Sequence, residues 1–390
     1  MKQKVVGITG CRSEYDILYS VFKRLDSEPK FELSVIVSGA HLAEKFGYTL
    51  QEIEDDGFTI AGKVHNLINS DQTIGKAKGA GLLLTGLSEL LCDLNPDYVI
   101  AAGDREEPLI AGIACTYLGI PLLHIGGGDK TYPGEKLGDV DEQVRHAVTK
   151  LASAHFPMAK EHEERLLSMG EESWRICCAG NPALDRFMEI PLKRREEITK
   201  YFGFQDHDKP LGLLIQHVIS SEREMGSEQI RLSLEALKEL DINCVVNYPN
   251  SDMGSQGIIS VIEEFRECRN FSVTRNIRRD YFVNLLRNID VLIGNSSMAF
   301  LEGAYLSLPA INVGRRQKGR LHGGNVVFVD HNKEQIRNAV ERVIFDDEFR
   351  KKLKKCQQIY GDGRSSERII TYLKELKKSK EELVSKKITY

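Results

Sequence analysis

The sequence predicts an α/β protein made of two doubly wound domains. Short apolar runs, typical of buried parallel strands, alternate with longer helical patterns, and this alternation continues through both halves of the chain. A length of 390 residues is too great for one ordinary core and favours two domains of roughly 150–200 residues each. Each domain should therefore carry its own parallel sheet with helices around it.

The individual elements follow from these patterns. Strands are expected in the first half at Lys4–Thr9, Leu33–Ser38, Tyr98–Ala102, Leu122–Ile125 and Ile176–Ala179. Helices are expected between and after them, at Glu14–Leu25, Lys76–Leu94, Pro108–Leu118, Asp141–Leu151 and Lys160–Met169. The same alternation of strands and helices continues in the second half, where strands are expected at Leu211–Gln216, Cys244–Asn247, Phe271–Thr274, Val291–Gly294, Ala310–Val313 and Val326–Val329.

A domain boundary is expected between about Asn181 and Lys209, where a charged stretch is followed by a polar turn. The final segment, Ser365–Ser385, is rich in Lys and Glu and has apolar residues at helical spacing. It should form an amphipathic helix that docks on a domain. We therefore expect a first domain of residues 1–185, joined by the C-terminal segment 365–390, and a second domain of residues 186–364.

Composition narrows the classes of partner. A net charge of −4 and a pI near 6.3 give no support to bulk nucleic-acid binding. The chain starts without a signal-peptide pattern and has no apolar run long enough for a bilayer, which predicts a cytoplasmic protein without a membrane partner. The eight cysteines are scattered without a CxxC pair or zinc spacing, so we expect reduced thiols.

Ligands of doubly wound sheets bind beyond the carboxyl ends of the strands, so the polar turns there are the candidate sites. The turn after the first strand contains Gly10 but is not GxGxxG, and its Arg12 is either a pyrophosphate clamp or a solvated charge. After Tyr98–Ala102 comes Gly103-Asp104-Arg105-Glu106-Glu107. Asp104 could act as acid or base there, with Arg105 holding its charge or binding substrate; the alternative is a solvated helix start.

The strand Leu122–Ile125 is followed by three glycines, which let a ligand approach the backbone closely. Carboxylates that could form a general acid/base pair come next, followed by the basic residues Arg145 and His146; the carboxylates are Asp129, Glu135, Asp139, Asp141 and Glu142. No calcium-loop spacing is present, so no metal is predicted.

In the second half, Ser296 and Ser297 follow the strand Val291–Gly294 at a predicted helix start, whose free N–H groups can hold a phosphate. Glu302, about one and a half turns on, could accept hydrogen bonds from ribose hydroxyls. The alternative is an ordinary capped turn. His217, Asn250 and the basic loop Gly314–Arg320 also follow strands. Each signal is weak alone, but together they predict an interdomain cleft lined by polar turns.

Taken in order, TGCRSEYD, GDREE, HIGGGD, DEQVRHAVTKLA, QHVISSE, YPNSDMGS, IGNSSMAFLEG and NVGRRQKGR closely resemble the hydrolysing UDP-N-acetylglucosamine 2-epimerase family, from roughly Lys4 to Val329. The resemblance implies two Rossmann-like domains of the glycosyltransferase-B type, with the sugar and the catalytic residues on the first and the nucleotide on the second. It further implies that a free 2-epimerised sugar and UDP are released on the way to sialic or legionaminic acids. No cofactor is expected, and the family suggests a homodimer.

Carried over motif by motif, the resemblance implies roles for individual residues. The substrate- and nucleotide-binding set would be Arg12, Asp16, Arg145, Asn250, Ser296, Ser297, Glu302, Arg316 and Arg320, with the two serines on the diphosphate and Glu302 on the ribose. The catalytic set would be Asp104, Arg105, Asp129, Asp141, Glu142 and His217, and His217 also belongs to the nucleotide-binding motifs.

One position departs from the family. Sialic-acid-type members have HIEGGE, in which the first Glu is thought to transfer a proton, whereas this chain has Gly126 there. Asp129, Glu135 and Glu142 are candidates to replace that carboxylate. Legionaminic-type relatives tolerate a residue other than Glu, which favours a 2,4-diacetamido-trideoxy sugar as substrate.

Three other functions stay open: a non-hydrolysing epimerase that adds UDP back, a glycosyltransferase on the same fold, and a nucleotide-sugar binding protein without catalysis. The charged residues of Gly103–Glu107 argue against the last, because a protein that only binds has little use for them.

Overall fold

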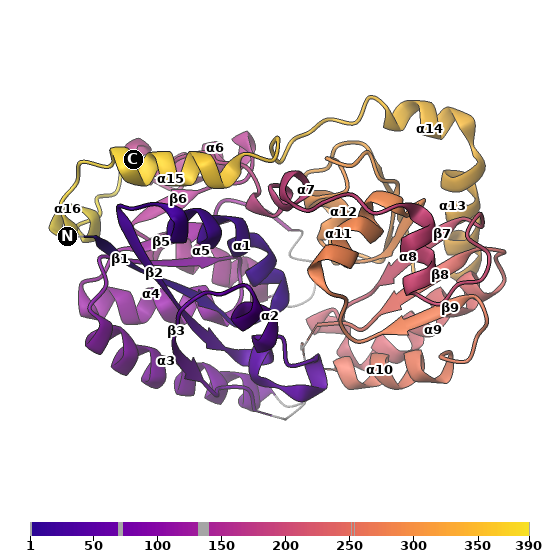
Figure 1. Ribbon diagram of the computed structural model, residues 1–390, viewed down its shortest axis with the longest axis horizontal. Coiled ribbons are helices and arrows are strands. Elements are labelled where there is room, and N and C mark those ends of the chain that lie inside the picture. The colour runs from indigo at the N-terminus through magenta and orange to yellow at the C-terminus, as the bar shows by residue number, and fades with distance from the viewer. Residues whose placement is uncertain (1, 69–72, 132–139, 251, 253, 390) are drawn as a thin grey trace. The chain divides into compact units, whose positions relative to one another are not determined.

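The computed structural model describes residues 2–68, 73–131, 140–250, 252 and 254–389. They form two compact units: the first comprises Met1–Asp129, Val140–Arg186 and Gly361–Tyr390, and the second is built on Phe187–Tyr360. Each unit holds a six-stranded sheet with helices on both of its sides (Figure 1). Since neighbouring strands pair in parallel in both sheets, the predicted α/β class with two doubly wound sheets is confirmed.

The first sheet has the strand order β3-β2-β1-β4-β5-β6. Its strands are β1 (Gln3–Thr9), β2 (Phe31–Ser38), β3 (Ile60–Val64), β4 (Tyr98–Ala102), β5 (Leu122–Ile125) and β6 (Ala154–Phe156). The helices of this unit are α1 (Arg12–Ser27), α2 (Leu50–Asp55), α3 (Thr73–Leu94), α4 (Glu106–Leu118), α5 (Val140–Leu151), α6 (Lys160–Ser168), α15 (Ser365–Glu375) and α16 (Lys380–Val384).

The second sheet has the order β12-β11-β10-β7-β8-β9. Its strands are β7 (Leu211–Ile215), β8 (Asn243–Asn247), β9 (Phe271–Thr274), β10 (Val291–Gly294), β11 (Ala310–Val313) and β12 (Val326–Val329). Its helices are α8 (Arg195–Tyr201), α9 (Gly226–Lys238), α10 (Ser255–Glu264), α11 (Arg279–Asn288), α12 (Met298–Leu301), α13 (Lys333–Phe345) and α14 (Asp347–Leu353), and α7 (Arg186–Glu189) lies where the two ranges meet. Of the described helices, none combines the length and apolar character that crossing a bilayer requires.

In both sheets the strand order reverses beside the first strand of the unit, between β1 and β4 and between β7 and β10. The connections that follow two such strands run to opposite faces of the sheet, and this leaves a crevice at the carboxyl ends of the strands. The turns after β1, β4, β7 and β10 therefore occupy the positions where doubly wound sheets bind ligands.

Successive residues of β1 point to opposite faces of the sheet, and both faces of this strand are covered by helices. Val6 and Ile8 join the apolar cluster that contains Leu83 and Leu87 of α3. Gly7 faces the other way, and a Cβ there would lie 2.2 Å from Cζ of Phe22. The glycine thus lets the Phe22 ring of α1 pack directly on the strand, so a larger side chain at this position should disrupt the packing of α1.

Three expectations were wrong. Ile176–Ala179 is not a strand, because only Ile176 forms a bridge, to His155. The C-terminal segment is not one helix: α15 ends at Glu375, and α16 begins after Ser379, which forms a capping box with Glu382. Strands β3 and β6 were missed because one contains Gly62 and Lys63 and the other has three residues.

Candidate active site

At the carboxyl end of β4, the side chain of Arg145 on α5 contacts two carboxylates of the predicted catalytic set. Its guanidinium donates to Asp104 through Nη2 and to Glu142 through Nη1, and Nη1 lies 3.4 Å from the main-chain oxygen of Asp129. Arg145 is only 1 % exposed, whereas the Asp104 side chain keeps 26 % of its surface. A buried cation thus fixes a carboxylate that solvent or a ligand can still reach.

The charge of Arg145 is held by its neighbours. Burial lowers the pKa of Arg145, but the neighbouring Asp104, Asp129 and Glu142 outweigh burial and raise it above its usual range. The guanidinium therefore stays charged at any accessible pH and holds Asp104 and Glu142 as acceptors.

Two histidines flank the cluster. Glu142 also lies 3.2 Å from Nε2 of His146, which is 43 % exposed, and Asp129 lies 3.3 Å from Nε2 of the buried His162. The predicted residues Asp104, Asp129, Glu142 and Arg145 are thus brought together in one network. Asp141 lies beside Glu142 in the first turn of α5, whereas Glu135 and Asp139 lie outside the described residues.

His124 supports the turn that carries Asp104. It is fully buried on β5, and its Nε2 donates to the Gly103 oxygen at 2.7 Å. Burial lowers the pKa of His124 to about 4, so the ring is neutral and serves as a donor to the main chain. The sequence contains His124 in the HIGGGD motif, but nothing in its spacing indicated this supporting role.

Gly126 follows β5 with φ +91°, a left-handed conformation that favours glycine. A Cβ built there would meet only Cε of Met158, at 3.3 Å, and the Gly103 nitrogen, at 3.9 Å. The backbone itself therefore accounts for a glycine. A Glu at this position would be strained by its φ, and its Cβ would also press on the end of the Met158 side chain.

The remaining predicted residues of the first unit lie on the turns after β1 and β4. Arg105 is the N-cap residue of α4. Arg12 opens α1 and lies 3.9 Å from Asp16 of the same helix. Asp16 also pairs with the buried Arg186, at 2.9 Å. The ion pair with Arg186 already explains an acidic residue at position 16. The structure therefore adds no support for the predicted role of Asp16 in nucleotide binding.

In the second unit, Asn295 joins the turns after β7 and β10. Its side chain accepts from the His217 N–H at 2.6 Å and donates to the His217 oxygen at 2.9 Å. The ring of His217 in turn accepts from the Asn250 N–H at 3.1 Å through Nδ1. His217, Asn250 and the Asn295 turn therefore form one hydrogen-bonded group at the β7–β10 crevice.

The serine turn differs in detail from the expected helix start. Helix α12 has only four residues, and Ser297 at its N-cap makes no side-chain capping bond. Instead, Oγ of Ser296 accepts from the Met298 N–H at 3.4 Å. Ser296 and Glu302 are nearly buried, at 9 % and 8 % exposure. The turn thus supplies hydroxyls and main-chain N–H groups rather than the dipole of a long helix.

The basic loop after β11 packs against this turn. Nη1 of Arg316 donates to the Asn295 oxygen at 3.3 Å, as does Nε2 of Gln317 at 3.2 Å, and Nη1 of Arg320 donates to Oε1 of Gln317 at 2.6 Å. The predicted residues Arg316 and Arg320 are therefore brought to Ser296 and Ser297 by two residues that the sequence motifs did not single out, Asn295 and Gln317. Asn295 could have been found as the first residue of the NSS motif.

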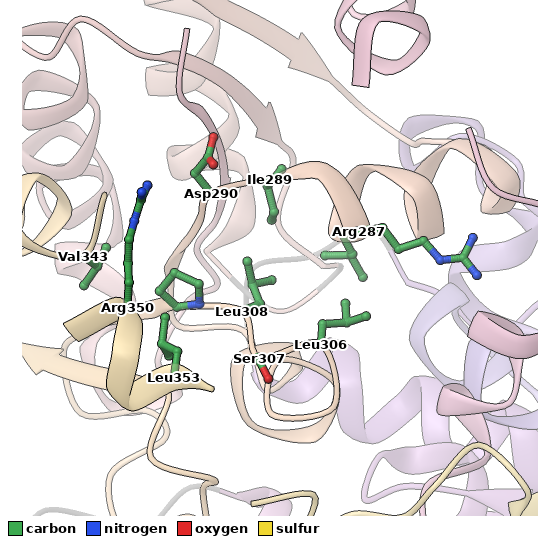
Figure 2. Close-up of a pocket in the computed structure, with 11 residues that line it drawn as sticks. Arg287, Ile289, Asp290, Leu306, Ser307, Leu308, Val343, Arg350 and Leu353 are labelled. Atoms are coloured by element: carbon green, nitrogen blue, oxygen red, sulfur yellow. The ribbon is translucent and has the colours of Figure 1, made fainter. Parts of the chain in front are cut away.

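A cavity of about 430 Å³ in the second unit lies elsewhere. It is lined by Asp290 and Leu308, which precede β10 and β11, so it opens at the amino ends of the strands (Figure 2). Its Asp290 carboxylate is already used, since it accepts from Arg195 and from the Leu211 N–H, both at 2.8 Å. Among the described residues, no group of three or more His, Cys, Asp and Glu has the arrangement of a metal site.

Comparisons with known proteins agree with this architecture. The family model described as UDP-N-acetylglucosamine 2-epimerase matches residues 23–374. The chain is 34 % identical, over 96 % of both chains, to a UDP-N,N'-diacetylbacillosamine 2-epimerase (hydrolyzing) of Legionella pneumophila. It is 28 % identical, over 84 % of both, to a GDP/UDP-N,N'-diacetylbacillosamine 2-epimerase (hydrolyzing) of Campylobacter jejuni.

Solved structures agree with the fold. A UDP-GlcNAc 2-epimerase from Neisseria meningitidis bound to UDP-GlcNAc superposes with a TM-score of 0.80 at 20 % identity, covering 96 % of this chain and 100 % of that one. The family resemblance read from the ordered motifs is thus confirmed.

Proposed function

Because the chain belongs to the UDP-N-acetylglucosamine 2-epimerase family, we propose that it is a hydrolysing 2-epimerase that converts a UDP-linked 2-acetamido sugar into the free 2-epimer and UDP. The observation that carries this proposal is the cluster in which buried Arg145 holds Asp104 and Glu142 at the carboxyl end of β4. Two hydrolysing relatives, one of them 34 % identical, support the release of a free sugar.

The reaction has two steps. In the first, a carboxylate takes the proton from C2 while the C1–O bond breaks, which leaves a 2-acetamidoglycal and UDP. In the second, water adds its oxygen to C1 and a proton returns to C2 from the other face, giving the free 2-epimer. We assign the two proton transfers to Asp104 and Asp141, with Asp129 and Glu142 as further carboxylates in the network.

The departing diphosphate needs fixed donors, and the second unit supplies them. Ser296 and Ser297 would bind it, with Arg316 and Arg320 adding positive charge beside their turn. Glu302 would accept from the ribose, and His217 with Asn250 would complete the set. Arg12 of the first unit would also contact the nucleotide. These assignments rest on the hydrogen-bonded group around Asn295 together with the family motifs.

Replacing Ser297 or Arg12 by alanine should weaken UDP binding by about 1–3 kcal/mol each, the cost of one hydrogen bond to a charged group. Isothermal titration calorimetry with UDP measures this directly. Ser227→Ala, on α9, is the matched control and should leave the Kd unchanged. Unchanged UDP affinity in both Ser297→Ala and Arg12→Ala would remove the nucleotide-binding assignment.

Gly126, which stands where sialic-acid-type relatives have Glu, supports a particular sugar. The Legionella relative carries the name of a diacetamido-sugar enzyme. We therefore include in the proposal a preference for a UDP-2,4-diacetamido-trideoxyhexose, as in legionaminic acid synthesis. Asp129, Glu142 or Glu135 would replace the family Glu, and Glu135 lies outside the described residues.

The preference is tested by measuring kcat/KM on UDP-N,N'-diacetylbacillosamine and on UDP-GlcNAc, with the products identified by NMR. We expect the diacetamido sugar to be favoured at least tenfold. An equal or higher kcat/KM on UDP-GlcNAc would contradict the preference. Gly126→Glu is not an informative variant, because φ +91° strains any side chain.

Two further features belong to the same proposal. A cytoplasmic location fits the cysteines, all eight of which are described and free. A homodimer is what the family resemblance implies.

A further inference from the structure

The crevice between β1 and β4 contains two buried acids that the proposed reaction does not use. In sheets of this type the N-terminus of the first helix commonly receives a phosphate of the ligand. Here the protein's own carboxylate occupies that place: Oε2 of Glu14, in the first turn of α1, accepts from the Gly10 N–H at 2.8 Å. Glu14 is 3 % exposed.

The second acid, Glu107, reaches the same turn from α4. It is 2 % exposed, and its Oε1 lies over Gly10 so closely that a Cβ on Gly10 would be 1.8 Å away. A Cβ on Gly39 would lie 3.0 Å from the same oxygen. Glycine at these two positions therefore makes room for the Glu107 carboxyl group, which would otherwise collide with the turn after β1.

The Glu14 and Glu107 carboxyl groups meet at Gly10, and one oxygen of each, Oε1 of Glu14 and Oε2 of Glu107, is buried without a hydrogen-bond partner among the described residues. A bond between two carboxyl groups requires a proton on one of them, since two carboxylates offer only acceptors. The charged groups that face the pair are Arg105 and Glu106 at the start of α4. The Cys11 thiol before α1 also faces it and is neutral, because burial raises its pKa to about 12. His41, which contacts Gly10 from the β2 side, is neutral because burial lowers its pKa to about 3.

We propose that Glu14 and Glu107 share one proton and act as positioning residues for the two turns of this crevice, the β1 turn that leads to Arg12 and the β4 turn that carries Asp104 and Arg105. Glu14 holds the first turn by its bond to Gly10, and Glu107 follows Asp104 by three residues, on the first turn of α4. The shared proton links the two turns, so its loss sets two negative charges against each other and separates them.

The pair should lose the shared proton near physiological pH. Burial raises the pKa of Glu14 well above its usual value, and burial with the charge of Glu106 raises that of Glu107 to about 7. Since these pKa values lie above the unfolded value of 4.5, the stability that the shared proton provides is fully present below pH 4.5 and is lost as the pH rises through about 7.

The test compares wild type, Glu107→Gln and the control Glu54→Gln, which removes an exposed carboxylate paired with Lys63 on another part of the unit. In Glu107→Gln, the new side-chain amide would donate to Glu14 and has no proton to lose. In wild type, kcat should fall roughly tenfold over about one pH unit above the apparent pKa of the pair. For Glu107→Gln, kcat should stay within about threefold of the wild-type maximum and should not fall over this pH range. For Glu54→Gln, kcat should depend on pH as in wild type.

Two results would overturn the proposal: the same alkaline fall in Glu107→Gln as in wild type, or a folded Glu107→Gln without turnover at any pH. The turnover test rests on the proposed function. The free energy of unfolding is therefore also measured by chemical denaturation between pH 5 and 9, which needs no substrate. Wild type should lose stability across neutral pH and Glu107→Gln should lose less. A protein inactive on both nucleotide sugars would contradict the function, while the denaturation data would still decide the proton sharing.

Discussion

Asp104→Asn and Asp141→Asn should each lower kcat by about 10²–10⁴-fold, the usual contribution of a general acid or base. Asparagine keeps the size of the side chain but cannot take or return a proton. In Asp104→Asn, Arg145 retains Glu142 as a partner, so the cluster should stay in place. Because the proposed nucleotide contacts use other residues, the Kd for UDP should change less than about threefold, or about 0.7 kcal/mol.

Steady-state kinetics and calorimetry on the same preparations separate the two effects. Asp93→Asn, on the exposed surface of α3, is the matched control and should retain wild-type kcat. Near-normal turnover in Asp104→Asn or Asp141→Asn would exclude that residue from proton transfer. A parallel loss of UDP affinity would show that the carboxylate acts in binding instead.

Arg145→Met should be the most damaging substitution for both folding and activity. It removes the cation that Asp104 and Glu142 share and leaves two carboxylates side by side at a mostly buried position. Breaking a buried ion pair from one side costs about 3–5 kcal/mol, and we expect about 3 kcal/mol here, since Asp104 can still be solvated. Turnover should also fall strongly, because the guanidinium that holds the Asp104 carboxylate is gone.

Urea denaturation gives the change in the free energy of unfolding, and activity is measured where the variant is still folded. The control is Arg231→Met, which removes an exposed ion pair to Glu264 in the second unit and should cost less than about 1 kcal/mol. A stability loss no greater than that of the control would show that Arg145 is not the centre of the cluster.

The strands with uninterrupted apolar runs were predictable from the sequence. The expected bounds of β4, β5 and β9 to β12 match the structure, because each is a short run of apolar, mostly β-branched or aliphatic residues followed by a polar turn. Ile176–Ala179 has the same local appearance, yet its main-chain bonds reach only the end of the sheet: the Cys177 N–H donates to His155 of β6, and the Ala179 N–H to Pro157 just after β6. A local pattern cannot tell whether a neighbouring strand continues far enough to pair.

The candidate site was predictable as a set of turns but not as a set of contacts. The motifs placed Asp104, Glu142 and Arg145 among the site residues, because Asp104 follows a strand and the other two lie in the DEQVRHAVTKLA motif. They did not indicate that one buried guanidinium joins these carboxylates, because the contact crosses 41 positions of sequence between Asp104 and Arg145. The bond from Asn295 to His217 spans 78 positions and was hidden for the same reason.

The C-terminal segment shows a signal that the sequence contains but a search for helical spacing overlooks. Ser379 and Glu382 form the capping box that starts α16, and that pattern marks a new helix inside the Lys/Glu-rich segment. Arg175 holds the end of this helix, through bonds to the main-chain oxygens of Leu383 at 2.7 Å and Ser385 at 3.1 Å. The C-terminal helices accordingly belong to the first unit (Figure 1).

The central claim, elimination of UDP followed by hydration, is tested most directly by running the preferred substrate in deuterated, oxygen-18-labelled water. We predict a free 2-epimer with one solvent deuterium at C2, and UDP without solvent oxygen-18, because the C1–O bond and not the P–O bond breaks. Mass spectrometry of UDP and NMR of the sugar read both labels. A product that keeps the substrate hydrogen at C2, a UDP-linked epimer, or oxygen-18 in UDP would contradict it.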